Sequence, residues 1–217
     1  MSERPSALSE AIAQMRSERV VRPRESVLIA SGGGIASVAT MAVLARARDE
    51  LGLSRVGVVA VDDGTLEGSD NCADAARAAR SLGLDVWVVE AEGRSVVRAG
   101  LDLVAADGWS RLAMGHTRED AAARVLREIL QGRPLRGLVR RRNDGVIRPL
   151  LWCDMPSADR LIWACGIESP VLLADRQALG STRFDRAIRE QLLPRLRAHL
   201  PSVDALLASL PAMSACK

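Results

Sequence analysis

A run of glycines near the start of the chain is the strongest chemical signal in the sequence. Ser26 to Ala30 (SVLIA) is typical of a buried strand, and a helical pattern begins at Val38. Between them, successive glycines allow several backbone N–H groups to turn toward one anion, and the start of a helix adds the positive end of its dipole. We therefore expect this turn to bind phosphate, with five candidate residues: Ser31, Gly32, Gly33, Gly34 and Ser37.

Acidic side chains follow two other apolar segments. Asp62 and Asp63 come after Val56 to Val61, and Glu119 and Asp120 come shortly after the short strand predicted at Arg111 to Gly115. Mg²⁺ in phosphate-binding sites is held by carboxylates together with phosphate oxygens. These four carboxylates are therefore candidate metal ligands, with Asp62 and Asp120 as the two that we select. The alternative for Glu119 and Asp120 is simple stabilisation of the first turn of a helix by negative charge.

His116 is one of only two histidines in the chain. It lies directly after Gly115, where it could contact phosphate or act as an acid. The alternative is a histidine hydrogen-bonded at the end of a strand, with no chemical role.

Apolar segments alternate with helical patterns along the first two thirds of the chain. Strands are predicted at 26–30, 56–61, 86–90, 111–115 and 146–151, and helices at 38–51, 69–82, 96–106 and 117–130. From 157 to 210 the sequence predicts helices broken by Pro170, Pro194, Pro201 and Pro211. This alternation indicates an α/β fold, a doubly wound and mainly parallel five-stranded sheet covered on both faces, with a helical C-terminal part.

The predicted fold brings the three polar turns to one edge of the sheet. Ligands of parallel sheets bind at the carboxyl ends of the strands, and the turns at 31–37, 62–68 and 115–120 all follow strands. We expect residues 1–24 to be an N-terminal helical extension, 25–155 a nucleotide-binding α/β domain and 156–217 a helical part of the same unit.

Composition excludes several classes of protein. Hydrophobic residues make up 48% and charged residues 26% of the 217 residues, which is typical of a globular chain. No transmembrane segment or export signal is recognised, and the four cysteines form no metal-binding pair, so we expect a reduced, cytoplasmic protein. Lys217 is the only lysine, which excludes an internal Schiff-base lysine or a phosphate-loop lysine.

Arginine supplies nearly all of the positive charge of the chain. The segment richest in arginine is a candidate surface for binding the RNA backbone, because guanidinium groups match the geometry of phosphates. The candidates are Arg133, Arg136, Arg140, Arg141, Arg142 and Arg148. The alternative is a solvated loop in an arginine-rich protein. With one Phe and no Tyr, a platform of aromatic residues for stacking bases is not expected.

The glycine turn alone fits three interpretations. Gly32-x-Gly34-x-x-Ser37 approximates a dinucleotide fingerprint, with Asp62 on a ribose, as in flavin- or NAD-binding proteins. It also approximates the S-G-G-x-D-S loop of ATP pyrophosphatases. The third is a tight turn without a ligand.

Downstream motifs favour the second interpretation. The segment from Gly115-His116 to Glu119-Asp120, with Leu130-Gln131-Gly132, resembles the G-H-x-x-D-D-Q-A-E-T-x-L-x-x-L-x-x-G stretch of the tRNA(Ile)-lysidine synthases, which share the PP-loop superfamily with tRNA 2-thiocytidine synthetases. Further matches follow in the same order between residues 25 and 210: Val61-Asp62-Asp63-Gly64 with Ser69-Asp70, Leu135-Arg136-Gly137-Leu138, Ile147-Arg148-Pro149-Leu150-Leu151, and Ile188-Arg189 through Leu196.

The resemblance implies an adenine nucleotide α-hydrolase-like fold and an ATP-dependent ligase that uses Mg²⁺. In that family ATP adenylates the C2 carbonyl of a tRNA cytidine, and lysine then displaces AMP. Cofactor-binding roles would fall on the glycine turn, Asp62 and Gly115, and catalytic roles on Asp120, His116 and Glu119. The partner would be tRNA or another nucleotide-containing acceptor, and homo- or hetero-oligomer formation stays open.

The chain also departs from the family pattern. Ile35 stands where the loop has its Asp, Ala36 stands where it has its Ser, and Asp62-Asp63 replaces a His-His pair. Because that Asp helps to hold magnesium on the leaving pyrophosphate, a non-catalytic or repurposed nucleotide-binding paralogue is the alternative to an active ligase.

Overall fold

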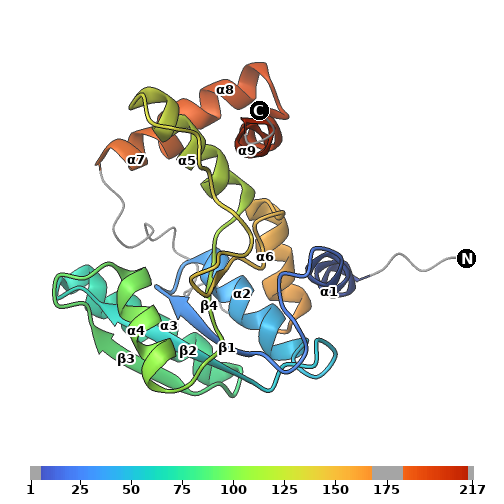
Figure 1. Ribbon diagram of the computed structural model, residues 1–217, viewed down its shortest axis with the longest axis vertical. Helices are drawn as coiled ribbons and strands as arrows, with labels where there is room; N and C mark the ends of the chain where they lie inside the picture. The colour runs from blue at the N-terminus through green and yellow to red at the C-terminus, as the bar shows by residue number, and fades with distance from the viewer. Residues whose placement is uncertain (1–5, 168–182, 215–217) are drawn as a thin grey trace, which may run out of the picture.

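A five-stranded parallel sheet forms the centre of the protein (Figure 1). The computed structural model describes residues 6–167 and 183–214; the predicted break at Pro170, and Cys216 and Lys217, lie outside the described residues. The strands are β1 (Ser26–Ser31), β2 (Arg55–Asp62), β3 (Val86–Glu90), β4 (Arg111–Met114) and β5 (Val146–Ile147), in the spatial order β3-β2-β1-β4-β5. The predicted doubly wound α/β fold is confirmed.

Alternate residues of β1 enter separate cores on the two faces of the sheet. Val27 and Ile29 pack into one apolar cluster, and Leu28 and Ala30 pack into the other. In register, Val27 lies beside Val56 of β2 and Arg111 of β4. A strand buried on both faces needs a continuous apolar sequence, which is why SVLIA was recognisable as a strand.

Helices cover both faces and extend beyond one end of the sheet (Figure 1). They are α1 (Ala7–Ser17), α2 (Ile35–Arg46), α3 (Leu66–Ser81), α4 (Val96–Ala106), α5 (Arg118–Leu130), α6 (Met155–Ala164), α7 (Arg183–Ala187), the π-helix η2 (Ile188–Leu192), α8 (Leu193–His199) and α9 (Val203–Ser214). The cluster that contains Val27 also holds residues of α1, α2, α3 and α6, and α4 contributes to the opposite cluster. Within residues 6–167 and 183–214, the structure has no helix that is both long and apolar enough to cross a membrane.

Helix α5 joins the sheet to the helical C-terminal part. Its far end packs against η2, α8 and α9 in a third apolar cluster that includes Val125, Ile188 and Leu207 (Figure 1). One helix of the predicted nucleotide-binding part therefore packs against the predicted helical part, and the boundary at residue 155 stays a prediction.

Several element boundaries differ from the sequence prediction. α3 begins at Leu66 rather than Ser69, because Thr65 caps it by accepting a hydrogen bond from the Gly68 amide at 2.9 Å. β5 ends at Ile147 rather than Leu151: the Arg148 amide bonds to the Arg140 carbonyl, and the next residue is a proline, which has no N–H to continue the ladder.

Two of the prolines predicted to break helices lie within the elements of the C-terminal part. Pro194 lies in the first turn of α8, where its missing N–H costs little, and Pro211 lies inside α9. The prediction of a break is therefore wrong for Pro211, whereas at Pro194 one element, η2, does end at Leu192 and α8 begins at Leu193.

Candidate functional site

The glycine turn lies between β1 and α2, at the point where the strand order reverses. The chain passes from β1 to β2 and β3 on one side, and β4 and β5 lie on the other. Ligands of doubly wound sheets bind at this switch point, beyond the carboxyl ends of the strands. The turn after β1 and the turn after β4 therefore flank the favoured position for a ligand.

Two serine hydroxyls hold the turn in shape. The Ser31 Oγ accepts a hydrogen bond from the Gly33 amide at 3.2 Å and donates to the Ser37 Oγ at 3.0 Å. The Ser37 hydroxyl in turn donates to the Gly34 carbonyl at 2.8 Å. Both predicted serines thus act on the turn itself in this structure, as a frame for its backbone.

Four backbone amides of the turn are left without an acceptor. Within the described residues, the N–H groups of Gly32, Gly34, Ile35 and Ala36 make no hydrogen bond to the protein. Gly34 is the N-cap of α2 and provides no capping side chain, and the first turn of α2 carries no acidic residue. The free amides and the positive end of the α2 dipole, which no acidic side chain of its first turn neutralises, together favour the binding of an anion.

Close packing fixes the turn against its neighbours. Gly33 has a φ of +77°, and a Cβ at this position would lie 2.9 Å from the Asp74 Cβ of α3. A Cβ on Gly115 would lie 2.4 Å from the Cα of Ser37. The backbone after β4 therefore touches the start of α2, which brings the first and third predicted turns together.

The acidic pair after β2 organises its own loop. Asp62 accepts hydrogen bonds from the Gly64 amide and the Ser69 hydroxyl, both at 2.9 Å and on different carboxylate oxygens. Asp63 accepts from the Thr65 hydroxyl at 2.6 Å and from the Thr65 amide at 3.1 Å, and these bonds hold the pKa of Asp63 below its ordinary value.

Asp120 is buried at the start of α5 with both oxygens engaged. One oxygen accepts from the amide and the hydroxyl of Thr117, at 2.6 and 3.1 Å, and the other binds the Arg189 guanidinium. Burial alone would raise the pKa of Asp120, but the charge of Arg189 and the Thr117 hydrogen bond hold the pKa below its ordinary value. Thr117 and Asp120 form the capping box that begins α5.

Glu119 points toward the start of α6. Its Oε1 accepts from the Met155 amide at 3.0 Å, and its Oε2 is buried with no hydrogen-bond partner among the described residues. This oxygen is the one position on the candidate carboxylates of α5 that is free to accept a further donor.

His116 is a hydrogen-bond acceptor for a buried arginine. The Arg148 Nε donates to the His116 Nδ1 at 3.2 Å, and another guanidinium nitrogen of Arg148 donates to the Val139 carbonyl at 2.8 Å. Burial, together with the positive charges of Arg148 and Arg189, lowers the pKa of His116 to about 4, and the negative charge of Asp120 opposes this shift. The ring is therefore neutral near pH 7, with its proton on Nε2, where it can donate a hydrogen bond to a ligand.

The candidate RNA-binding arginines divide into three groups by their surroundings. Arg140 pairs with Glu18, Arg141 pairs with Glu25 at 2.5 Å, and Arg142 pairs with Asp144 at 2.5 Å. Arg148 is buried, as described above. Arg133 and Arg136 are exposed, and neither guanidinium forms an ion pair with another described residue. They are the two arginines of this set whose charge is fully available to a phosphate.

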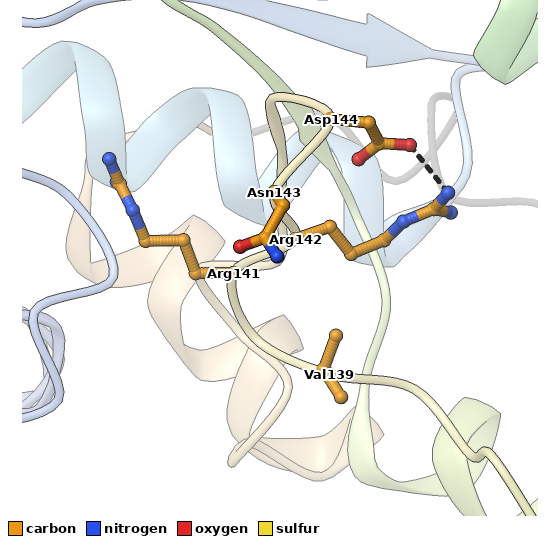
Figure 2. A pocket seen from close by; sticks show the side chains of 5 residues that line it. All are labelled: Val139, Arg141, Arg142, Asn143 and Asp144. Atoms are coloured by element: carbon orange, nitrogen blue, oxygen red, sulfur yellow. Dashed lines mark hydrogen bonds and ion pairs between the residues drawn. The ribbon is translucent and has the colours of Figure 1, made fainter.

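An open hollow of about 390 Å³ lies on the arginine-rich loop (Figure 2). It is lined by Val139, Arg141, Arg142, Asn143 and Asp144. The Arg142 and Asp144 side chains point toward each other across it, whereas Arg141 is directed away from them (Figure 2). Because Arg142 and Asp144 neutralise each other and Arg141 is paired with Glu25, the glycine turn is the better candidate for binding a phosphate.

Three residues with clear structural importance were not among the predicted site residues. Arg189 lies in η2 and reaches Asp120, a contact that no local pattern reveals. The Glu128 carboxylate accepts from the amides of Arg136 and Gly137, both at 2.9 Å, and shapes the loop after α5. Asn71 is buried in α3, its Oδ1 has no partner among the described residues, and its carbonyl lies against Gly33.

The carboxylates do not fit a magnesium ion held by the protein. Within the described residues, no group of three or more His, Cys, Asp or Glu side chains is arranged to hold a metal. Asp62 and Asp120, the predicted ligands, each have both oxygens occupied by donors of the chain. Their role as metal ligands stays a prediction without support from this geometry.

Comparison with known proteins identifies relatives over most of the chain. No protein-family model matches. The tRNA(Ile)-lysidine synthase of Streptomyces coelicolor is 32% identical over 194 residues, which cover 80% of this chain and 53% of that protein. That of Salinispora tropica is 32% identical over 201 residues, which cover 75% of this chain and 60% of that protein. The chain thus spans about half the length of the curated relatives it matches.

Solved structures share the fold at low sequence identity. A U34-tRNA thiolase of Methanococcus maripaludis, solved with its [4Fe-4S] cluster, matches with a TM-score of 0.76 at 14% identity, over 95% of this chain and 78% of that one. An NMN synthetase of Francisella tularensis matches with a TM-score of 0.53 at 12% identity, over 97% and 93% of the two chains. These similarities establish the architecture.

Proposed function

Because the chain belongs to the tRNA(Ile)-lysidine synthase family within the PP-loop superfamily, as a diverged member, we propose that it binds ATP at the glycine turn and uses it to modify a tRNA base. The proposal makes the protein an ATP-dependent carbon–nitrogen ligase. ATP is its cofactor, and tRNA or another nucleotide-containing molecule is the acceptor.

The proposed reaction has two steps. The carbonyl oxygen of the base attacks the α-phosphorus of ATP, and the bond to pyrophosphate breaks. An amine then forms a C–N bond at the same carbon, loses a proton, and expels AMP together with the former carbonyl oxygen. The first step requires the triphosphate to be held with its α-phosphorus exposed to the base, and positioning of this kind is a large part of catalysis.

The observation that carries the proposal is the set of four amides without acceptors at the switch point of the sheet. A nucleotide phosphate would satisfy these donors and would gain from the positive end of α2. Ser31 and Ser37 hold the loop in the required shape, and Gly115 allows the backbone after β4 to approach it.

Three residues outside the glycine turn, His116, Asp120 and Glu119, have proposed roles that follow from their contacts. The neutral His116 ring offers an N–H to a phosphate oxygen or to the base, as a hydrogen-bond donor rather than a charged acid. Asp120 fixes Arg189, and so places a positive charge at the start of α5. Glu119 keeps one buried oxygen free for the incoming amine or a water molecule.

The test is release of pyrophosphate and AMP from ATP, measured with tRNA transcripts and free lysine, each omitted in turn. We expect release that requires the tRNA, with AMP formation that requires the amine. Measurable ATP binding without any release under these conditions would contradict the ligase and leave a nucleotide-binding protein.

A non-catalytic nucleotide-binding paralogue is the second candidate, and Ile35 and Ala36 favour it. The double substitution Ile35→Asp with Ala36→Ser restores the family pattern of the loop. If pyrophosphate release appears only in this variant, the natural chain is the non-catalytic relative. The family assignment leaves the flavin or NAD interpretation without support.

A further inference from the structure

The glycine turn presents donors and no negative charge, and we infer that it binds the phosphates of its nucleotide through backbone amides, without a metal ion held by the protein. This inference rests on the proposed binding of ATP. It concerns how the phosphates are neutralised, which the family relationship alone would assign to magnesium.

The donors are already in place. The amides of Gly32, Gly34, Ile35 and Ala36 lie on consecutive or near-consecutive residues, and none is used by the described protein. Such a run of N–H groups forms an anion-binding concavity whose partial positive charge is supplemented by the helix dipole. No acidic residue in the first turn of α2 opposes this potential.

The candidate carboxylates form no cluster of metal ligands within the described residues, and each already accepts a donor of the chain. Asp120 is neutralised by Arg189, and a divalent cation at the same carboxylate would have to displace that guanidinium or lie beside it. Asp62 is held by the Gly64 amide and the Ser69 hydroxyl. Glu119 is bound through one oxygen to the start of α6, and its second oxygen, which has no partner among the described residues, would be a single ligand.

Ile35 is the position at which this turn lacks the negative charge of the family pattern. It is the first residue of α2, it follows Gly34 directly, and its side chain packs against the main apolar cluster. An aspartate here would place a carboxylate among the free amides, where it would attract a cation and repel an unchelated phosphate. The isoleucine removes both effects.

The experiment is calorimetric titration of the protein with ATP, once in excess EDTA and once in excess MgCl₂. The inference predicts binding in both buffers, with dissociation constants that agree within about threefold, or less than 1 kcal/mol. Binding in MgCl₂ that disappears in EDTA would overturn the inference and leave the proposed function standing. Absence of binding in both buffers would overturn both.

A matched pair of variants at one position tests the physical cause. Ile35→Asp and Ile35→Asn lose the same apolar contact and differ in charge. We expect Ile35→Asp to lose on the order of tenfold in ATP affinity in EDTA and to recover it in MgCl₂. Ile35→Asn should bind equally in the two buffers. Equal behaviour of the two variants would contradict the inference, and thermal melting by circular dichroism checks that both are folded.

Discussion

Asp120 links the start of α5 to a residue of η2 that lies far away in the sequence. Its carboxylate caps the helix through Thr117 and binds Arg189. Removing one partner of a buried ion pair leaves the other charge buried without compensation. The resulting loss of stability is usually larger than the net stabilisation that the pair itself provides. Arg189 is about one third exposed, so water screens part of this cost.

We expect Asp120→Asn to lower the free energy of unfolding by about 1–3 kcal/mol, because Asn keeps the cap but not the charge. Urea unfolding of this variant, of Arg189→Gln and of the double variant measures the coupling between the two residues. The double variant should lose less than the sum of the single losses. Strict additivity would show that the two side chains do not stabilise each other in solution.

His116 should make the free energy of unfolding depend on pH. Its pKa is about 4 in the folded protein, against 6.5 for an ordinary histidine, so the unfolded chain binds more protons between these values. Stability contributed by the neutral ring is therefore fully present above pH 6.5 and is lost as the pH falls toward 4.

The measurement is urea unfolding at pH 7 and pH 5 for the natural chain and for His116→Gln, whose amide oxygen can still accept from Arg148. The natural chain should lose on the order of 1–2 kcal/mol between the two pH values, and the variant should lose less. Glu25, with a pKa of about 2, titrates below this window and does not obscure the comparison. The same loss in both proteins would rule out His116 as the origin.

At the scale of elements, the contact between β4 and α2 is the arrangement that builds the site. Gly115 permits it, since a Cβ there would lie 2.4 Å from the Ser37 backbone. We expect Gly115→Ala to displace the start of α2 and to weaken ATP binding by at least about tenfold.

Gly132→Ala is the control for this prediction. Gly132 has a φ of +61°, and a Cβ there would meet nothing within 4 Å, so the substitution carries backbone strain of about 1–2 kcal/mol without a clash. Its ATP affinity, measured by the same titration, should match that of the natural chain. Equal weakening by both substitutions would mean that general destabilisation, and not the position of α2, controls binding.

Helices and strands were predictable from the sequence where one local residue pattern was sufficient to identify them. β1 and β2 are continuous apolar segments, and Thr117 with Asp120 marks the start of α5. The end of β5 and the start of α3 depend on a carbonyl of Arg140 and on the cap at Thr65, which a residue pattern does not reveal.

The position of the glycine turn was predictable from the sequence, and the contacts of the charged candidate residues around it were less so. A glycine-rich sequence after a strand constrains its own backbone, and the turn lies where it was expected. The partners of Asp120 and of the arginines come from distant segments, such as Arg189 and Glu18, and only the folded chain brings them together.

At the scale of the whole molecule, the loop after α5 exposes two arginines suited to a large anionic partner. Arg133 and Arg136 follow α5 and have no ion pair among the described residues, whereas Arg140 and Arg142 are paired with Glu18 and Asp144. An unpaired guanidinium can bind an RNA phosphate without first breaking an ion pair.

We therefore expect Arg133→Ala with Arg136→Ala to weaken tRNA binding and to reduce the salt dependence of the affinity by about two counterions. The matched control is Arg140→Ala with Arg142→Ala, which removes the same charge and should change the affinity less. Filter binding over a range of salt concentrations measures both. A larger loss in the control pair would place the RNA surface on the loop drawn in Figure 2.

The claim on which the whole account depends is that the free amides after β1 hold the phosphates of a nucleotide. The most direct measurement is a ¹⁵N–¹H correlation spectrum of the protein recorded during titration with ATP. The account predicts that the largest downfield amide shifts fall on Gly32, Gly34, Ile35 and Ala36, the residues whose N–H groups have no acceptor in the described chain. If these four resonances stay in place while ATP shifts amides in another part of the molecule, the nucleotide binds elsewhere and the account is contradicted.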